Sequence, residues 1–122
     1  MNTYGTILVG LVLLIPNLVV QAGSEVLPEV RITEIWTDNG NFGGCGAKIS
    51  PPTTLATCFY KDYILFDCDR KVQTPSKTSA NLFSAAQLGL ATGNKTYVRV
   101  LDSKSINGIC FADKVNVSNI SW

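Results

Sequence analysis

The chain has 122 residues, with ten Lys or Arg side chains against nine Asp or Glu and no histidine. This near-neutral balance, without a run of basic residues, argues against a nucleic-acid partner and against binding to an anionic membrane surface. The absence of histidine removes the imidazole base on which serine and cysteine nucleophiles usually depend. We therefore expect a protein that is not an enzyme and that uses no cofactor.

The first 22 residues have the features of a secretory signal peptide. They carry no charged side chain, and Ile7–Ile15 is a nine-residue apolar run that is too short to span a bilayer. The run from Val20 to Ala22 has the kind of residues that a signal peptidase reads, so we expect cleavage after Ala22. No Lys or Arg precedes the apolar run, and a buried N-terminal strand or an uncleaved anchor is the alternative. The expectation is a secreted or periplasmic protein, with residues 23–122 as one domain and no direct membrane insertion.

The cysteine content predicts two disulfides. An even number of cysteines in a small exported chain indicates cross-links, because a domain of this size buries limited surface. Of the three connectivities, we favour one bond across a hairpin and one that joins the middle of the chain to its last strands. No Cys-x-x-Cys pair is present, so no zinc site is expected. The favoured pairs are Cys45–Cys58 and Cys68–Cys110.

The first half of the expected domain has the patterns of strands. Glu29–Trp36 alternates and then slips phase near its end, which indicates a strand with a bulge. An Asn- and Gly-rich turn follows, and Cys45–Ser50 predicts a short strand that ends at two prolines. Aromatic and β-branched residues over Leu55–Asp69 predict either one long bent strand or two strands that meet near Lys61.

One helix is expected after a polar connection. Ser79 is a plausible N-cap, and Gly93 stands where a left-handed C-cap is needed. Between them, four apolar residues recur at helical spacing and form one stripe that we expect to be buried: Leu82, Phe83, Ala86 and Leu90.

Two further strands complete the chain. Thr96–Leu101 alternates, with Val98 and Val100 on one face. Asn107-Gly108 is a strong hairpin signal, and the last strand follows it.

The order of elements predicts a mainly β fold with one α-helix. Three strands, a helix and two strands match an OB-fold-like five-stranded small barrel, in which the helix lies between strands three and four. The helix would then plug one open end of the barrel. A half-open antiparallel sheet with the helix across one face is the alternative.

Acidic and aromatic residues supply the candidate sites. Asp67 and Asp69 could act as a carboxylate pair or hold calcium, but Asp-x-Asp more often marks a solvated strand end, and we expect no metal there. Several aromatic residues could stack on sugar rings: Trp36, Phe42, Tyr60, Tyr63 and Tyr97. Core packing is the preferred role for Phe59, Phe66 and Phe111, and it competes evenly with sugar binding for Trp36.

Four segments carry a resemblance to a known family. They read "SEVLPEVRITEI", "FGGCGAKI", "LATCFY" and "NLFSAAQLGLATGNKTYVRVL". With them the chain resembles the B subunits of the subtilase-cytotoxin and typhoid-toxin kind, within the pertussis-like AB5 group. The resemblance implies an OB-fold protomer, a homopentamer, a catalytic A subunit on its central pore, and binding to sialylated host glycans. In that family a serine at the start of the first strand contacts the sugar, and Ser24 is the nearest match, although the tyrosines that precede that serine in the family are missing here.

The sequence thus predicts a secreted glycan-binding B subunit of an AB5-like toxin that delivers a catalytic partner. The alternative is a small disulfide-bonded periplasmic or extracellular module with a structural or inhibitory role. Residues near the first strand and on the strand after the helix are the candidate glycan contacts: Ser24, Trp36, Asp38, Asn39, Tyr97 and Arg99.

Overall fold

The structure is a computed structural model that describes residues 23–69 and 77–122. The expected signal peptide, residues 1–22, lies outside the described residues. Within the described ranges, none of the helical segments has the length and apolar character needed to cross a bilayer. The elements are β1 (Ser24–Thr37), β2 (Cys45–Ser50), β3 (Tyr63–Leu65), α1 (Lys77–Thr92), β4 (Asn94–Ile106) and β5 (Ile109–Ser121).

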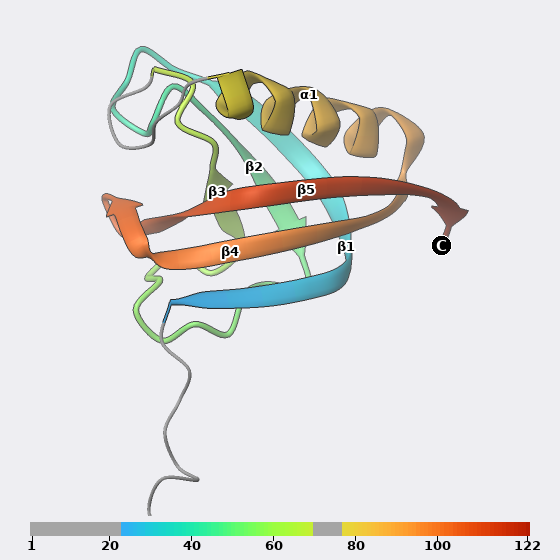
Figure 1. Ribbon diagram of the computed structural model, residues 1–122, viewed down its shortest axis with the longest axis horizontal. Coiled ribbons are helices and arrows are strands. Elements are labelled where there is room, and N and C mark those ends of the chain that lie inside the picture. Colours follow the sequence, from blue (N-terminus) through green and yellow to red (C-terminus); the bar gives the residue numbers. More distant parts are fainter. Residues whose placement is uncertain (1–22, 70–76) are drawn as a thin grey trace, which may run out of the picture.

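The five strands form one sheet that closes on itself. Their order is β1-β2-β3-β5-β4, and β4 pairs back onto β1. All neighbours are antiparallel except β3 and β5, which run parallel. The helix lies between β3 and β4 in the chain, and in Figure 1 it runs above β5 along one side of the closed sheet. The expected mainly β, OB-fold-like arrangement is confirmed.

The core is built from the inward faces of the strands. Val98 and Val100 on β4 are fully buried, as the alternation predicted. They pack in one cluster with residues of β1, β2 and the helix, and with Phe66 just after β3. A smaller second cluster consists of Leu65, Ile109 and Phe111. Phe66 and Phe111 are therefore core residues, as expected.

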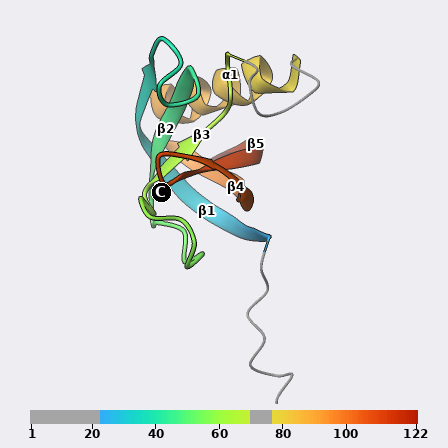
Figure 2. The same cartoon turned by 90° about the vertical axis from the view of Figure 1, so that its left-hand side faces the viewer.

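The helix packs on this core through a stripe that differs from the predicted one. Figure 2 shows the helix lying above the strands. Leu82 and Ala86 are buried as expected, and the ring of Phe83 lies 6.2 Å from that of Phe66. Leu90 is 37 % exposed, so its predicted burial is wrong. Gly89 takes its place, because a Cβ on Gly89 would come within 3.0 Å of the side chain of Ile32.

The helix ends confirm one predicted cap and correct the other. Gly93 has φ of +68° and its N–H donates to the carbonyl of Gly89 at 2.9 Å, which ends the helix as expected. Ser79 is not the N-cap, because the helix begins at Lys77 and Ser79 is buried within its first turn. No charged side chain follows Lys77 before Gly93, and neither end carries charges that complement the helix dipole.

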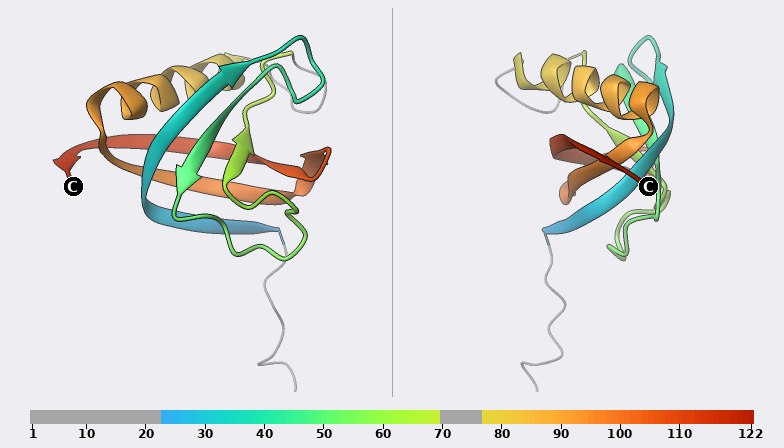
Figure 3. Two further views of the ribbon diagram at one scale, coloured as in Figure 1. Left: turned by 180° about the vertical axis from the view of Figure 1, so that it is seen from behind. Right: turned by 90° about the vertical axis from the view of Figure 1, so that its right-hand side faces the viewer.

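β1 is long and pairs with two strands in turn (Figure 3). Its first half pairs with β4 and its second half pairs with β2. The register with β2 shifts between Ile32 and Glu34, close to the predicted bulge. The register with β4 shifts between Leu27 and Val30, around Pro28, which has no N–H to donate. These irregularities bend the strand, which helps the sheet to close.

The four cysteines form two disulfides, but not in the favoured pairing. The bonds are Cys45–Cys68 and Cys58–Cys110, and none of the four is free. The pairing follows from the position of β3 between β2 and β5, which the sequence did not reveal. Cys68 follows β3 and is tied to β2, whereas Cys58 precedes β3 and is tied to β5. Both bonds fit an oxidising compartment outside the cytosol.

The segment predicted as one or two strands after the prolines is mostly a loop. Only Tyr63–Leu65 is a strand, and residues 51–62 form the β2–β3 loop. Phe59 lies in this loop and is 76 % exposed, so its predicted core role is wrong. Asp67 is fully buried with φ of +59°, which also contradicts the expected solvated strand end.

Candidate functional site

An open cleft of about 400 Å³ lies on the outer face of the barrel, where three loops meet. The β1–β2 loop and the β4–β5 hairpin border it, with β3 and the β2–β3 loop between them. In OB-folds this face, between the first and last of these loops, is where oligonucleotides and oligosaccharides bind. Its lining residues are Trp36, Phe42, Tyr60, Tyr63, Asn107 and Ile109.

The half-buried indole of Trp36 lines the cleft. Trp36 pairs with Gly46 on β2, and a Cβ at Gly46 would come within 2.3 Å of the indole. The missing side chain therefore lets the ring lie against the neighbouring strand. The ring of Tyr63 meets the indole edge-on, with centroids 5.5 Å apart. Both rings rest on the second core cluster, which supports them from below.

The β1–β2 loop is held by Asp38. Its Oδ1 accepts hydrogen bonds from the backbone N–H of Gly40 at 2.6 Å, of Phe42 at 3.4 Å and of Gly44 at 3.3 Å. These bonds fix the loop that presents Phe42 to the cleft. Asp38 was predicted as a glycan contact, and in the structure its Oδ1 holds the loop that borders the cleft. Asn39 is exposed on the same loop but does not line the cleft.

The β4–β5 hairpin locks the other two loops together. Asn107 and Gly108 have φ of +53° and +83°, which confirms the predicted tight turn. The Nδ2 of Asn107 donates to the carbonyl of Asn41 at 3.0 Å, joining the hairpin to the β1–β2 loop. The carbonyl of Gly108 accepts from the N–H groups of Phe59 at 2.9 Å and Tyr60 at 3.1 Å, joining it to the β2–β3 loop.

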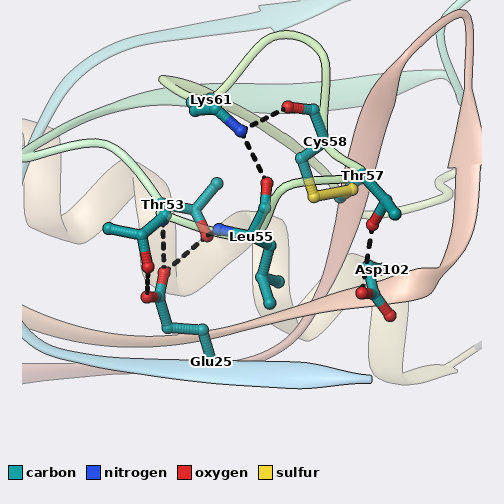
Figure 4. Close-up of a disulfide and its surroundings, with 9 residues drawn as sticks. Glu25, Thr53, Leu55, Thr57, Cys58, Lys61 and Asp102 are labelled. Atoms are coloured by element: carbon teal, nitrogen blue, oxygen red, sulfur yellow. Dashed lines mark hydrogen bonds between the residues drawn. A yellow bond between two sulfur atoms is a disulfide. The ribbon is translucent and has the colours of Figure 1, made fainter. Parts of the chain in front are cut away.

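Glu25 anchors the start of the β2–β3 loop to β1 (Figure 4). Its Oε1 accepts from the Thr53 hydroxyl at 2.6 Å and from the Thr54 N–H at 2.7 Å, and the Thr54 hydroxyl donates to its other oxygen. Burial alone would raise the pKa of Glu25, but these hydrogen bonds outweigh it and lower the pKa. The ionised carboxylate is therefore the form that holds the loop.

Further contacts fix the rest of the same loop. The Thr57 hydroxyl donates to Asp102 at 3.0 Å, and Lys61 Nζ donates to the carbonyls of Leu55 at 2.6 Å and Cys58 at 3.0 Å (Figure 4). The Cys58–Cys110 disulfide closes the loop onto β5. Tyr60 is thus presented to the cleft by a segment that is held along its whole length, which reduces the ordering cost of binding.

The remaining predicted contacts lie on a different face. Ser24 is exposed at the start of β1, opposite Leu101 of β4, and Trp36 is near the other end of that strand. Tyr97 and Arg99 share the outer face of β4, as predicted. Arg99 is already occupied, because its Nε and one terminal nitrogen each contact a carboxylate oxygen of Asp113 at 2.7 Å. This hydrogen bonding raises the pKa of Arg99.

The structure therefore divides the predicted glycan residues between two places. Trp36 lines the cleft, with Asp38 and Asn39 on its bordering loop, while the other three lie on the β1–β4 face. Three further aromatic residues singled out from the sequence join Trp36: Phe42, Tyr60 and Tyr63. Asn107 and Ile109 line the cleft but were missed, although the Asn-Gly turn signal marked their position. Among residues 23–69 and 77–122, no three acidic, cysteine or histidine side chains are grouped to hold a metal.

Comparison with known proteins assigns no family. No family model matches the chain, and neither a curated protein nor a solved structure matches it. The geometry and chemistry of the cleft are therefore the basis for the proposed function.

Proposed function

We propose that the protein is a secreted glycan-binding module that holds a sugar ring in the aromatic cleft. The observation that carries this proposal is the convergence of four aromatic rings on an open cleft at the usual binding face of the fold. A pyranose has a face of C–H groups, and its burial against an indole is favourable. Trp36 supports one face of the sugar, while Phe42 and Tyr60 flank it.

Polar groups at the rim suit the hydroxyls of a sugar. The phenol groups of Tyr60 and Tyr63 can each donate and accept, and the side chain of Asn107 lies beside them. A mostly apolar site with a few polar groups is the general form of a small-molecule site. The three bordering loops are cross-linked by hydrogen bonds and a disulfide, so the cleft is formed before the ligand arrives.

The test is glycan-array screening of the mature protein followed by titration calorimetry. Trp36→Ala should weaken binding about 30-fold, since a central aromatic contact is worth about 2 kcal/mol. Tyr97→Ala is the matched control, because it removes an aromatic ring from the other face. If Trp36→Ala lowers the melting temperature, Tyr60→Ala is the second variant, since Tyr60 is exposed. Unchanged binding by both cleft variants, or no binding by the wild type, would contradict the proposal.

The toxin-like role is the finer part of the proposal and is supported by the sequence resemblance. In that role the protein is a B subunit that assembles as a homopentamer, binds sialylated host glycans and delivers a catalytic A subunit. A ring of five weak sites would raise avidity without new contacts. Ser24→Ala tests the location that the resemblance implies for the sugar. Mass measurement in solution tests the ring, which a concentration-independent monomer would exclude.

A structural or inhibitory module is the second candidate. The observation that favours it is Phe59, which protrudes from the anchored β2–β3 loop and is 76 % exposed. A rigid loop with an exposed aromatic residue suits insertion into a partner protein. Loss of a partner's binding in Phe59→Ala, with no glycan binding by the wild type, would favour this second function.

A further inference from the structure

A second hollow, of about 340 Å³, lies on the outer face of the β1–β2 pair. Arg31 and Ser50 stand directly opposite each other in the ladder, and Thr33 is exposed two residues further along β1. Pro51 and Trp122 complete the lining. Trp122 follows β5, whose end lies beside the bend of β1 (Figure 3). The hollow therefore combines a guanidinium, two hydroxyls and an indole.

The cation of this hollow, Arg31, contacts an indole, and within the described part of the chain it has no acidic partner. The guanidinium of Arg31 lies 5.1 Å from the centre of the Trp122 ring, and Lys95 Nζ lies 5.2 Å from it. Lys95 is paired with Glu29 at 3.5 Å, whereas no carboxylate of the described ranges lies within ion-pair distance of Arg31. An exposed guanidinium held against an indole keeps its planar set of N–H donors free for an oxyanion, which it can bind with two parallel hydrogen bonds.

This hollow continues toward the aromatic cleft. Thr33 and Ser50 also line a third hollow, which contains Lys48 and Lys61 together with Asp62. Lys48 and Asp62 form an ion pair at 3.9 Å, so Arg31 is the cation on this path that carries the charge argument. Lys48 Nζ in turn lies 5.6 Å from the centre of the Tyr63 ring, at the edge of the cleft. The three hollows therefore follow one another across the outer faces of β1, β2 and β3.

The length and charge of this surface limit the ligand. Trp36 and Arg31 are five residues apart on β1, which corresponds to roughly 17 Å at the rise of a strand. A single sugar ring does not cover that length. None of the six residues that line the aromatic cleft is charged, whereas Arg31 at the far end is a cation without an ion pair among the described residues.

We infer that the outer face of β1–β2–β3 binds an acidic oligosaccharide along its length. An uncharged sugar ring lies on Trp36, and an oxyanion of a more distant unit, a carboxylate or a sulfate, binds Arg31 with the hydroxyls of Thr33 and Ser50. Trp122 supports the acidic unit from the side. This inference rests on the proposed glycan function and assigns the residues that set its charge specificity.

The experiment compares three probes of equal length by calorimetry on the mature protein. They are a neutral tetrasaccharide, the same chain with one terminal uronate, and the same chain with one terminal sulfate. At least one acidic probe should bind about tenfold more tightly than the neutral one. Comparison of the uronate and sulfate probes identifies which oxyanion is preferred. The advantage should shrink at high salt, because Arg31 is exposed.

Arg31→Gln should reduce the advantage of the acidic probe to less than about twofold while leaving affinity for the neutral probe unchanged. Lys114→Gln is the matched control, since it removes an exposed cation beside Tyr97 on the other face. Equal affinity for all three probes, or an advantage that persists in Arg31→Gln, would overturn the inference and leave the proposed function standing. No binding of any probe, or full neutral binding by Trp36→Ala, would instead show that the proposed function has failed.

Discussion

The two disulfides hold the shortest strand of the sheet from both sides, and their loop lengths predict how much each one stabilises the fold. Cys58–Cys110 spans 52 residues in the chain and Cys45–Cys68 spans 23. In the chain-entropy model, bonds of these separations stabilise the folded state by about 4 and about 3.4 kcal/mol respectively. Removing Cys58–Cys110 should therefore cost about 0.7 kcal/mol more than removing the other bond.

The assay uses two matched variants, each with a pair of cysteines replaced by alanine. Alanine avoids leaving an unpaired hydroxyl at these buried positions, and each variant loses the same two sulfur atoms. Urea denaturation should give both losses in the unfolding free energy, with the variant lacking Cys58–Cys110 the less stable. Because small domains are stabilised by only about 5–15 kcal/mol, removal of both bonds should leave the protein largely unfolded.

Glycan binding provides a second readout of the same variants. Cys58 anchors the loop that carries Tyr60, whereas Cys45–Cys68 lies on the other side of β3. At low urea, the first variant should therefore lose more affinity than the second. Equal losses of stability, or a greater loss in the variant lacking Cys45–Cys68, would refute the loop-length reasoning.

Two further predictions concern the loop anchor and the helix. Glu25→Gln should lower the free energy of unfolding most above pH 4.5, the ordinary pKa of this side chain. The difference in unfolding free energy between variant and wild type should vanish as the pH falls through the lowered pKa of Glu25 in the folded state. Urea denaturation across this pH range measures the difference in unfolding free energy. A difference that grows toward acid pH would contradict the prediction. Leu82→Ala should cost about 3 kcal/mol of unfolding free energy, whereas Leu90→Ala should cost less than about 0.5 kcal/mol. Similar melting temperatures for the two variants would contradict this assignment of the buried stripe.

The sequence predicted the elements that have strong local patterns. The β1 bulge, the β2 strand, the glycine that ends the helix and the Asn-Gly hairpin all follow from backbone preferences of a few residues. The disulfide pairing could not be predicted from the sequence. It depends on a parallel contact between β3 and β5 that has one paired position, Leu65 with Phe111. Phe59 was misplaced for a related reason. Its aromatic surroundings indicated a strand, but backbone bonds to the hairpin keep it in a loop.

The candidate site was only partly predictable. The aromatic residues that line the cleft were recognised as residues able to stack on a sugar, but they come from four segments of the chain. Nothing in their spacing showed that Trp36 and Tyr63 meet while Tyr97 lies on another face. The sequence predicts Asp38 as a glycan contact because its carboxylate could bond sugar hydroxyls. Its bonds to the loop N–H groups appear only when the turn is folded. Gly46 gave no signal, since its role depends on the ring across the ladder.

The lack of helix-stabilising charges at either end of α1 has a consequence for how the molecule moves. Most of the stability of a helix in a protein comes from packing of its apolar face, and α1 has no charges at its ends that favour the helix dipole. Its folded state therefore depends on the contacts of Leu82, Ala86 and Gly89 with the sheet. Its amide protons should become open to hydrogen exchange together with those of the strands beneath it, in one cooperative event. The helix therefore cannot protect the core on its own. A change that destabilises the sheet also exposes the core residues beneath the helix.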